Sequence, residues 1–266
     1  MPTDRYSHGH HESVLRSHRW RTAENSAAFL LPHLRRTMSV LDVGCGPGNI
    51  TAGLARKVDH GSIVGVDIEP SVIDIANVEQ SDKAANLSFQ VGDVYRLDFA
   101  DEHFDVVYAH QLLQHVGRPV AALQEMRRVL KTGGLLAVRD GDYGAFAWYP
   151  ADAVLDRWMT LYHELTTRNG AQADAGRRLK AWARAAGFES VTESSSNWTF
   201  QSDEERAWWG GLWADRVRES EFAAQCIEYG LSDLDELETI AEAFLRWSSD
   251  PDGVFLAVNG EVLARR

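Results

Sequence analysis

The chain has 266 residues, a formal net charge of −12 at pH 7 and two cysteines. This length accommodates one α/β domain with an insertion or a small cap. The negative charge and the lack of a long basic run argue against nucleic acid as a partner, and the distant Cys45 and Cys226 predict neither a disulfide framework nor a zinc site. No apolar run approaches the roughly 18 residues of a membrane helix, and no export signal is evident. We therefore expect a cytoplasmic protein without membrane insertion.

The first 38 residues are expected to form a helical lid. Several histidines lie near the start of the chain, but no neighbouring cysteine completes a metal-binding set. We therefore predict no metal, and retain His11 as a candidate contact to a substrate. The pattern of residues 20–34 predicts a helix that packs on the following domain through one apolar face, formed by Ala27, Leu30, Leu31 and Leu34.

An apolar run that ends in an acid and continues into a glycine-rich turn occupies residues 40–49. Residues 39–43 have the composition of a buried strand and residues 50–58 that of a helix, so the turn joins a strand to a helix. Glycines allow the backbone to approach a ligand closely, and the N–H groups at a helix start favour an anionic group. A dinucleotide-binding fingerprint would need a glycine at the position of Asn49.

A second strand is predicted at residues 62–67, and it ends in Asp67. A carboxylate about 20 residues after such a turn is positioned to bind ribose hydroxyls. Further strands are expected near residues 87–91, 104–109 and 134–139, alternating with helices near 71–77, 111–116 and 119–130. This alternation predicts an α/β fold, in which helices flank a mostly parallel, Rossmann-like sheet.

The glycine turn is followed by two further signals in a recognisable order. Residues 41–48 read LDVGCGPG, Asp67 follows, and residues 92–94 read GDV. Residues 104–110 (FDVVYAH) and 128–138 (RVLKTGGLLAV) extend the pattern. Together these motifs resemble the class I S-adenosylmethionine-dependent methyltransferases, nearest the small-molecule type of ubiquinone and menaquinone biosynthesis. The resemblance is good over residues 39–140, which implies an S-adenosylmethionine-binding core there.

The resemblance also implies which residues hold the methyl donor. Asp67 would bind the ribose, Ile68 and Val94 would flank the adenine, and Asp93 would bind its amino group. Asp42 and the glycine turn would hold the methionine part, with His110 and Gln111 beside it. The implied cofactor-binding residues of the turn itself are Gly44, Cys45, Gly46 and Gly48.

The candidate catalytic and substrate-binding residues follow the fourth and fifth predicted strands. Methyl transfer from a sulfonium mainly requires orientation of two reactants and exclusion of water, so a catalytic side chain is optional. His110 lies at the carboxyl edge where open α/β sheets bind ligands, and is the candidate general base; the alternative is that only its backbone meets the donor. The candidate substrate contacts at this edge are His115, Asp140, Asp142 and Tyr143.

Residues 141–266 are expected to combine the remaining core strands with helical insertions. Eight of the nine tryptophans lie between Trp148 and Trp247, and apolar stripes with helical spacing occur at residues 154–165 and 234–245. Strands are expected at 191–200 and at 255–258 with 262–264. The long segment between them, residues 201–250, predicts a helical cap over the mouth of the site, with Trp209 as a candidate substrate contact.

These features predict a methyltransferase that uses S-adenosylmethionine and yields S-adenosylhomocysteine. The acceptor is expected to be a small, partly apolar metabolite methylated by in-line displacement, and the protein a monomer or homodimer. Two alternatives stay open. One is a non-catalytic module that binds S-adenosylmethionine or S-adenosylhomocysteine, and the other is a nicotinamide-dependent oxidoreductase, against which Asn49 argues.

Overall fold

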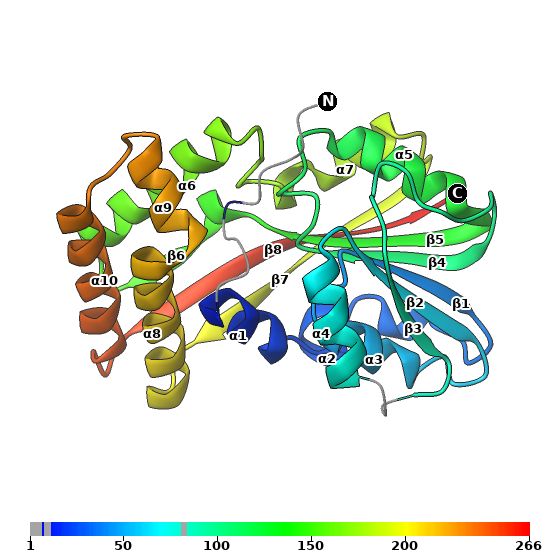
Figure 1. Cartoon of the computed structure of the whole chain (residues 1–266), viewed down its shortest axis with the longest axis horizontal. Coiled ribbons are helices and arrows are strands. Elements are labelled where there is room, and N and C mark those ends of the chain that lie inside the picture. Colours follow the sequence, from blue (N-terminus) through cyan, green and yellow to red (C-terminus); the bar gives the residue numbers. More distant parts are fainter. Residues whose placement is uncertain (1–6, 8–11, 81–83) are drawn as a thin grey trace.

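The structure is a computed structural model that describes residues 7, 12–80 and 84–266. Within these residues, one eight-stranded sheet has the order β3-β2-β1-β4-β5-β8-β6, and β7 pairs with the outer side of β8 (Figure 1). Strands β1 to β5 are parallel, whereas β8 is antiparallel to β5, β6 and β7. The predicted α/β fold with a mostly parallel sheet is confirmed. The strands are β1 (Ser39–Val43), β2 (Ser62–Asp67), β3 (Leu87–Val91), β4 (Phe104–His110), β5 (Leu130–Gly141), β6 (Ala147–Tyr149), β7 (Ser190–Phe200) and β8 (Val254–Arg265).

Helices cover both faces of the sheet, with α2 and α3 below it and α5 and α7 above it in Figure 1. Because side chains alternate along a strand, adjacent residues enter different cores. Val40 packs in the cluster with α2 and α3, whereas its neighbour Leu41 packs in the cluster with α5 and α7. The helices are α1 (Glu12–Trp20), α2 (Ala23–Ser26), α3 (Asn49–Ala55), α4 (Pro70–Gln80), α5 (Pro119–Val129), α6 (Ala153–Arg168), α7 (Leu179–Ala185), α8 (Asp203–Glu219), α9 (Glu221–Glu228) and α10 (Leu234–Ser248).

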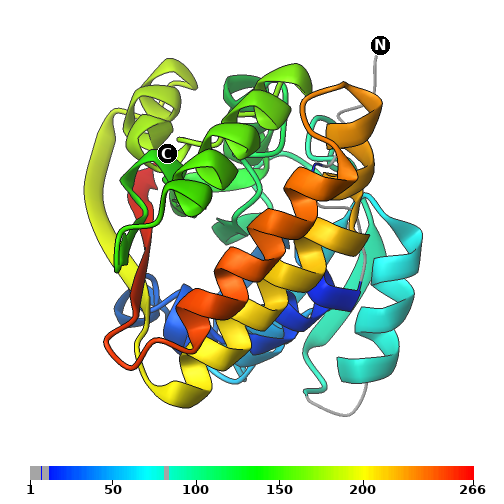
Figure 2. The ribbon, with the colours of Figure 1, turned by 90° about the vertical axis from the view of Figure 1, so that its left-hand side faces the viewer.

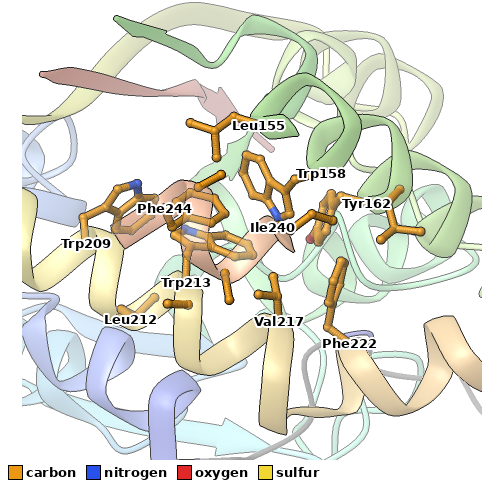
Figure 3. Packing of buried hydrophobic residues seen from close by; sticks show 14 of the residues in the cluster. Leu155, Trp158, Tyr162, Trp209, Leu212, Trp213, Val217, Phe222, Ile240 and Phe244 are labelled. Carbon is orange, nitrogen blue, oxygen red and sulfur yellow. The ribbon is translucent and has the colours of Figure 1, made fainter. Parts of the chain in front are cut away.

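The helices α6, α8, α9 and α10 form a helical cap at one end of the sheet (Figure 1). Helix α8 packs against both α10 and α1, so that these three helices lie side by side (Figure 2). The interior of the cap is aromatic, and Trp158 of α6 meets Trp213 of α8 edge to face with ring centroids 4.5 Å apart (Figure 3). Phe244 of α10 stacks on Trp213 and meets Trp158 edge to face. The aromatic residues of the insertions therefore build the core of the cap.

The cap is joined to the sheet by two unusually long strands. β7 and β8 pair continuously from Ser190 with Arg265 to Phe200 with Phe255. Along β8, Val262 is buried in the core of the sheet, while Phe255 is buried in the core of the cap. The two cores therefore share one pair of strands.

The prediction of one helix over residues 20–34 is wrong. Helix α1 ends at Trp20, α2 is a single turn, and a short 3₁₀ helix follows at Leu31–His33. Thr22 explains the break, because its side chain accepts a hydrogen bond from the Asn25 amide and caps a new helix start. Ala27 and Leu30 are nevertheless buried against the sheet, as their spacing indicated.

Two other predicted boundaries are also corrected. Residues 111–116 form turns rather than a helix, because Gln111 adopts a positive φ of 48° directly after β4. The two short strands expected at 255–258 and 262–264 are one strand, β8. Gly260 lies within β8, where the backbone of Gly176 packs directly against it. A side chain at position 260 would collide with Gly176, so glycine lets the strand pass this point without a break.

Candidate active site

A cavity of about 340 Å³ opens at the carboxyl ends of the first four strands, between the sheet and the helices α1 and α8. Ligand sites of open α/β sheets occupy this edge. The cavity brings together twelve of the residues predicted from the sequence, namely Asp42, Gly44, Cys45, Gly46, Asp67, Ile68, Asp93, Val94, His110, Gln111, His115 and Tyr143.

The glycine turn is held against the end of β2 by hydrogen bonds. The amides of Gly44 and Cys45 both donate to the carbonyl oxygen of Val66, at 2.8 and 3.0 Å, and the amide of Gly46 donates to Asp67 Oδ2 at 3.0 Å. Gly48 has a φ of 80° and a Cβ there would fall on the ring of Phe89, so this position requires glycine. Gly48 is the N-cap residue of α3 and is not part of the cavity lining.

Three acids line the side of the cavity formed by β1, β2 and the turn after β3. Burial raises the pKa of Asp42 to about 7, although a 2.6 Å hydrogen bond from Thr51 Oγ1 opposes the shift and the charge of Asp67 adds to it. The Asp67 carboxylate accepts hydrogen bonds from the amides of Gly46 and Glu69. Asp93 accepts one from the Tyr95 amide at 2.8 Å. The three carboxyl groups make this side of the cavity suitable for a cationic group and for hydroxyl groups of a ligand, which can donate hydrogen bonds to them.

His110 ends β4 and is 5% exposed. Neither of its ring nitrogens has a hydrogen-bond partner among the described residues, and its ring meets Trp198 edge to face with centroids 5.6 Å apart. Burial, helped by the charges of Arg139 and Arg21, holds the pKa of His110 well below its usual range. The imidazole is therefore neutral, and offers one donor and one acceptor to a ligand in the cavity.

The turns after β4 are held in place by β5. Asp140 accepts a hydrogen bond from the Gln114 amide at 2.9 Å, and Gln114 Oε1 accepts one from the Gly141 amide. Burial raises the pKa of Asp140 to about 8. It also lowers the pKa of His115, whose ring borders the cavity, to about 3. Asp140 therefore positions the turn that carries His115, and is not part of the cavity wall.

Three other predicted site residues lie elsewhere or outside the described chain. Asp142 forms an ion pair with Arg177. Trp209 is buried in the cap, where its ring stacks on Phe200 at 4.2 Å. Neither side chain lines the cavity. His11 falls outside the described residues, so the structure does not place it.

Helices α1 and α8 contribute further cavity residues, and among them only His18 belongs to the histidines noted near the start of the chain. Arg216 of α8 donates a hydrogen bond to Ser17 Oγ of α1 at 3.0 Å, although the two residues are 199 positions apart. Beside them, α1 and the residue after it place Val14, His18 and Arg21 in the cavity wall. No local sequence pattern connects these positions, because the contact depends on how α8 packs against α1.

The comparison with known proteins decides the family. A family of methyltransferase domains matches residues 34–202. The chain belongs to this methyltransferase family. An uncharacterised methyltransferase of Schizosaccharomyces pombe is 33% identical over 276 residues, which cover all of this chain and 98% of the relative. A ubiquinone biosynthesis O-methyltransferase of Coxiella burnetii is 37% identical over 98 residues, 36% of this methyltransferase and 41% of the relative.

A solved structure agrees with this fold. Phosphoethanolamine N-methyltransferase 2 of Haemonchus contortus, in complex with phosphomonomethylethanolamine and S-adenosylhomocysteine, matches with a TM-score of 0.56. It is 17% identical and the match covers 90% of this methyltransferase and 52% of that chain. The family result argues against a nicotinamide-dependent oxidoreductase.

In residues 7, 12–80 and 84–266, no group of three His, Cys, Asp or Glu side chains is placed to hold a metal ion. Over the same residues, no helix has both the length and the apolar character needed to cross a membrane.

Proposed function

We propose that this enzyme transfers the methyl group of S-adenosylmethionine to a small, partly apolar metabolite. The cavity carries the proposal, because one continuous space reaches from the three acids at the strand ends to the residues of α1 and α8. Its volume, about 340 Å³, is that of a small-molecule site. A non-catalytic donor-binding module would not need this second wall of polar and apolar cap residues.

The residues around the acids fit the donor. A glycine turn, the carboxylate of Asp67 and the exposed side chain of Ile68 are available for a methionine moiety, a ribose and an adenine face respectively. Bound S-adenosylmethionine supplies a methyl group activated by a positively charged sulfonium. We assign Asp42 to the donor's amino group and Asp93 to the adenine amino group, as the resemblance implied, and Val94 to the other adenine face.

His110 is the residue we assign to the acceptor. Its neutral, unpartnered ring can accept a proton from an acceptor hydroxyl or simply orient that group by a hydrogen bond. Gln111 fixes the strand end beside it, since its amide donates to the Arg139 carbonyl and its side chain donates to Asn259 Oδ1 at 3.2 Å. These contacts fix the backbone next to His110, and the edge-to-face contact with Trp198 packs its ring, which serves the orientation of two reactants.

The division of the chain is also part of the proposal. We assign the donor site to residues 39–140, a lid to residues 1–38, and the acceptor cap with the remaining core strands to 141–266. Support comes from α1, which packs against α8 (Figure 2) and lines the cavity together with it. A cytoplasmic location is proposed as well, supported by two cysteines that are free.

Calorimetric titration with S-adenosylhomocysteine and, separately, with NADH tests the donor assignment. We expect binding of the first and none of the second. Incubation with a panel of small metabolites and isotope-labelled S-adenosylmethionine then tests transfer, with acceptor-dependent label in a small product as the expected result. Donor binding without transfer to any acceptor would favour the non-catalytic module, and transfer only to a protein or nucleic acid would refute the small-molecule proposal.

A further inference from the structure

One row of side chains crosses the sheet beside the cavity. Strand pairing places His110 of β4 opposite Arg139 of β5, and Arg139 opposite Glu261 of β8. Paired residues of adjacent strands present their side chains on the same face of a sheet. Trp198 of β7 packs on this row, because the guanidinium of Arg139 lies 4.5 Å from its ring centroid and its ring meets that of His110. The four side chains therefore form one contiguous group next to the site.

The imidazole of His110 is oriented by packing rather than by hydrogen bonds. Catalytic histidines are commonly oriented by a carboxylate or carbonyl oxygen that accepts a hydrogen bond from one ring nitrogen. In the described part of the chain, neither buried ring nitrogen of His110 has such a partner. Its ring instead meets the ring of Trp198 edge to face, with centroids 5.6 Å apart. The rotation of the imidazole therefore depends on Trp198.

Trp198 is itself held on several sides. Its indole N–H donates a hydrogen bond to the carbonyl oxygen of Asn25 at 2.8 Å, and the ring of Trp20 meets its ring edge to face at 5.3 Å. The planar guanidinium of Arg139 lies over the indole, where a cation is attracted to the aromatic face. Arg139 is held in turn by Glu261, whose Oε1 lies 3.4 Å from its Nε atom in a buried ion pair. These contacts hold the indole ring in one position.

The charged and titratable groups that face His110, among the residues that the structure describes, are basic. Burial lowers the pKa of His110 most, and Arg139 of β5, Arg21 after α1 and His18 of α1 lower it further. The neutral ring keeps one donor and one acceptor nitrogen for a ligand. In a different rotation the ring would turn carbon atoms toward the cavity, and a hydrogen bond to the acceptor would be lost.

We propose that Trp198 is a positioning residue of this enzyme: its ring edge, supported by Arg139, fixes the imidazole of His110 so that a ring nitrogen faces the acceptor. Trp198 does not line the cavity, so it acts through His110 and touches no reactant. This inference rests on the proposed function, which assigns His110 to the acceptor. It adds to the site a residue of β7, the strand that joins the sheet to the cap.

NMR spectroscopy of the histidine side chains tests the inference in the protein saturated with S-adenosylhomocysteine. The signals of His110 are identified in isotope-labelled protein by their loss in His110→Ala, and are followed between about pH 8 and about pH 5. In the wild type we expect nuclear Overhauser effects between the rings of His110 and Trp198, and no titration of His110 over this range. In Trp198→Leu the ring should titrate within the range, because water can then reach it. Trp198→Phe keeps a ring edge and should largely restore the wild-type behaviour.

Trp208→Leu is the matched control. Trp208 of α8 also packs against Trp20, with ring centroids 5.3 Å apart, but it does not line the cavity and it is Trp198 that meets His110. The control should leave the signals and the titration of His110 unchanged. Binding of S-adenosylhomocysteine reports that each variant is folded.

Arg139→Lys tests the support of the indole ring. It keeps a cation beside Glu261 but loses the planar group over Trp198, so the Overhauser effects between Trp198 and His110 should weaken.

Three results would overturn the inference while leaving the proposed function intact. They are the absence of the Overhauser effects in the wild type, the same titration of His110 in the wild type and in Trp198→Leu, and a change in Trp208→Leu as large as that in Trp198→Leu. If Trp198→Leu does not fold, Arg139→Lys decides, and undiminished Overhauser effects there would overturn the inference. Failure of the wild-type protein to bind S-adenosylhomocysteine would instead overturn the proposed function.

Discussion

Donor binding should depend on pH through Asp42. Because burial raises the pKa of this carboxyl to about 7, most molecules carry a proton on it at pH 6 and few do at pH 8. The cationic amino group of the donor binds the ionised Asp42 carboxylate. At low pH the carboxyl must therefore lose its proton before the donor can bind. The ionised fraction rises from about one eleventh to about ten elevenths between these pH values, which predicts roughly tenfold tighter binding at pH 8, or about 1.4 kcal/mol.

Calorimetry with S-adenosylhomocysteine from pH 6 to pH 8 measures this dependence. Asp42→Asn keeps an oxygen that can accept the hydrogen bond from Thr51, but it cannot ionise. The variant should bind more weakly at pH 8 and show the same affinity at both pH values. Asp59→Asn, at an exposed carboxylate that pairs with Arg36, is the control and should behave as the wild type does. A wild-type affinity that is flat across this range would refute the assignment of Asp42 to the amino group.

Three further substitutions test separate parts of the account. Asp67→Ala should weaken S-adenosylhomocysteine by about 1.5–3 kcal/mol through loss of charge-assisted hydrogen bonds, measured by calorimetry; unchanged affinity would remove Asp67 from the ribose site. His110→Ala should lower turnover by about 10²–10⁴-fold with little change in donor affinity, and parallel losses of both would contradict a role toward the acceptor. Trp213→Ala should lower the free energy of unfolding by about 3–5 kcal/mol, whereas Leu245→Ala, at a partly exposed cap position, should change it far less.

The sheet was predictable because its strands are buried and end in recognisable residues. Residues 39–43 and 62–67 were placed correctly from apolar runs and glycines, and the acid that ends β2, Asp67, does line the cavity. These signals are local to each strand and turn. Stacking parallel strands then brings their carboxyl ends to one edge, which gathers the donor side of the site without further information.

The acceptor side was not predictable in this way. Ser17 and Arg216 meet only because α1 packs against α8, and neither residue belongs to a local motif. The helix expected at residues 111–116 fails for a related reason. Gln111 takes a left-handed conformation, and Asp140, 26 residues beyond Gln114, holds the turn by accepting a hydrogen bond from its amide. Tertiary contacts of this kind override local helical preference.

A crystal structure of the complex with S-adenosylhomocysteine tests the central claim most directly. The account predicts the ribose at Asp67, the adenine between Ile68 and Val94, and open space between the sulfur atom and the side chains of His110 and Arg216. A nucleoside bound elsewhere, or a ligand whose sulfur atom is sealed off from His110 and α8, would contradict the claim that one cavity holds both donor and acceptor.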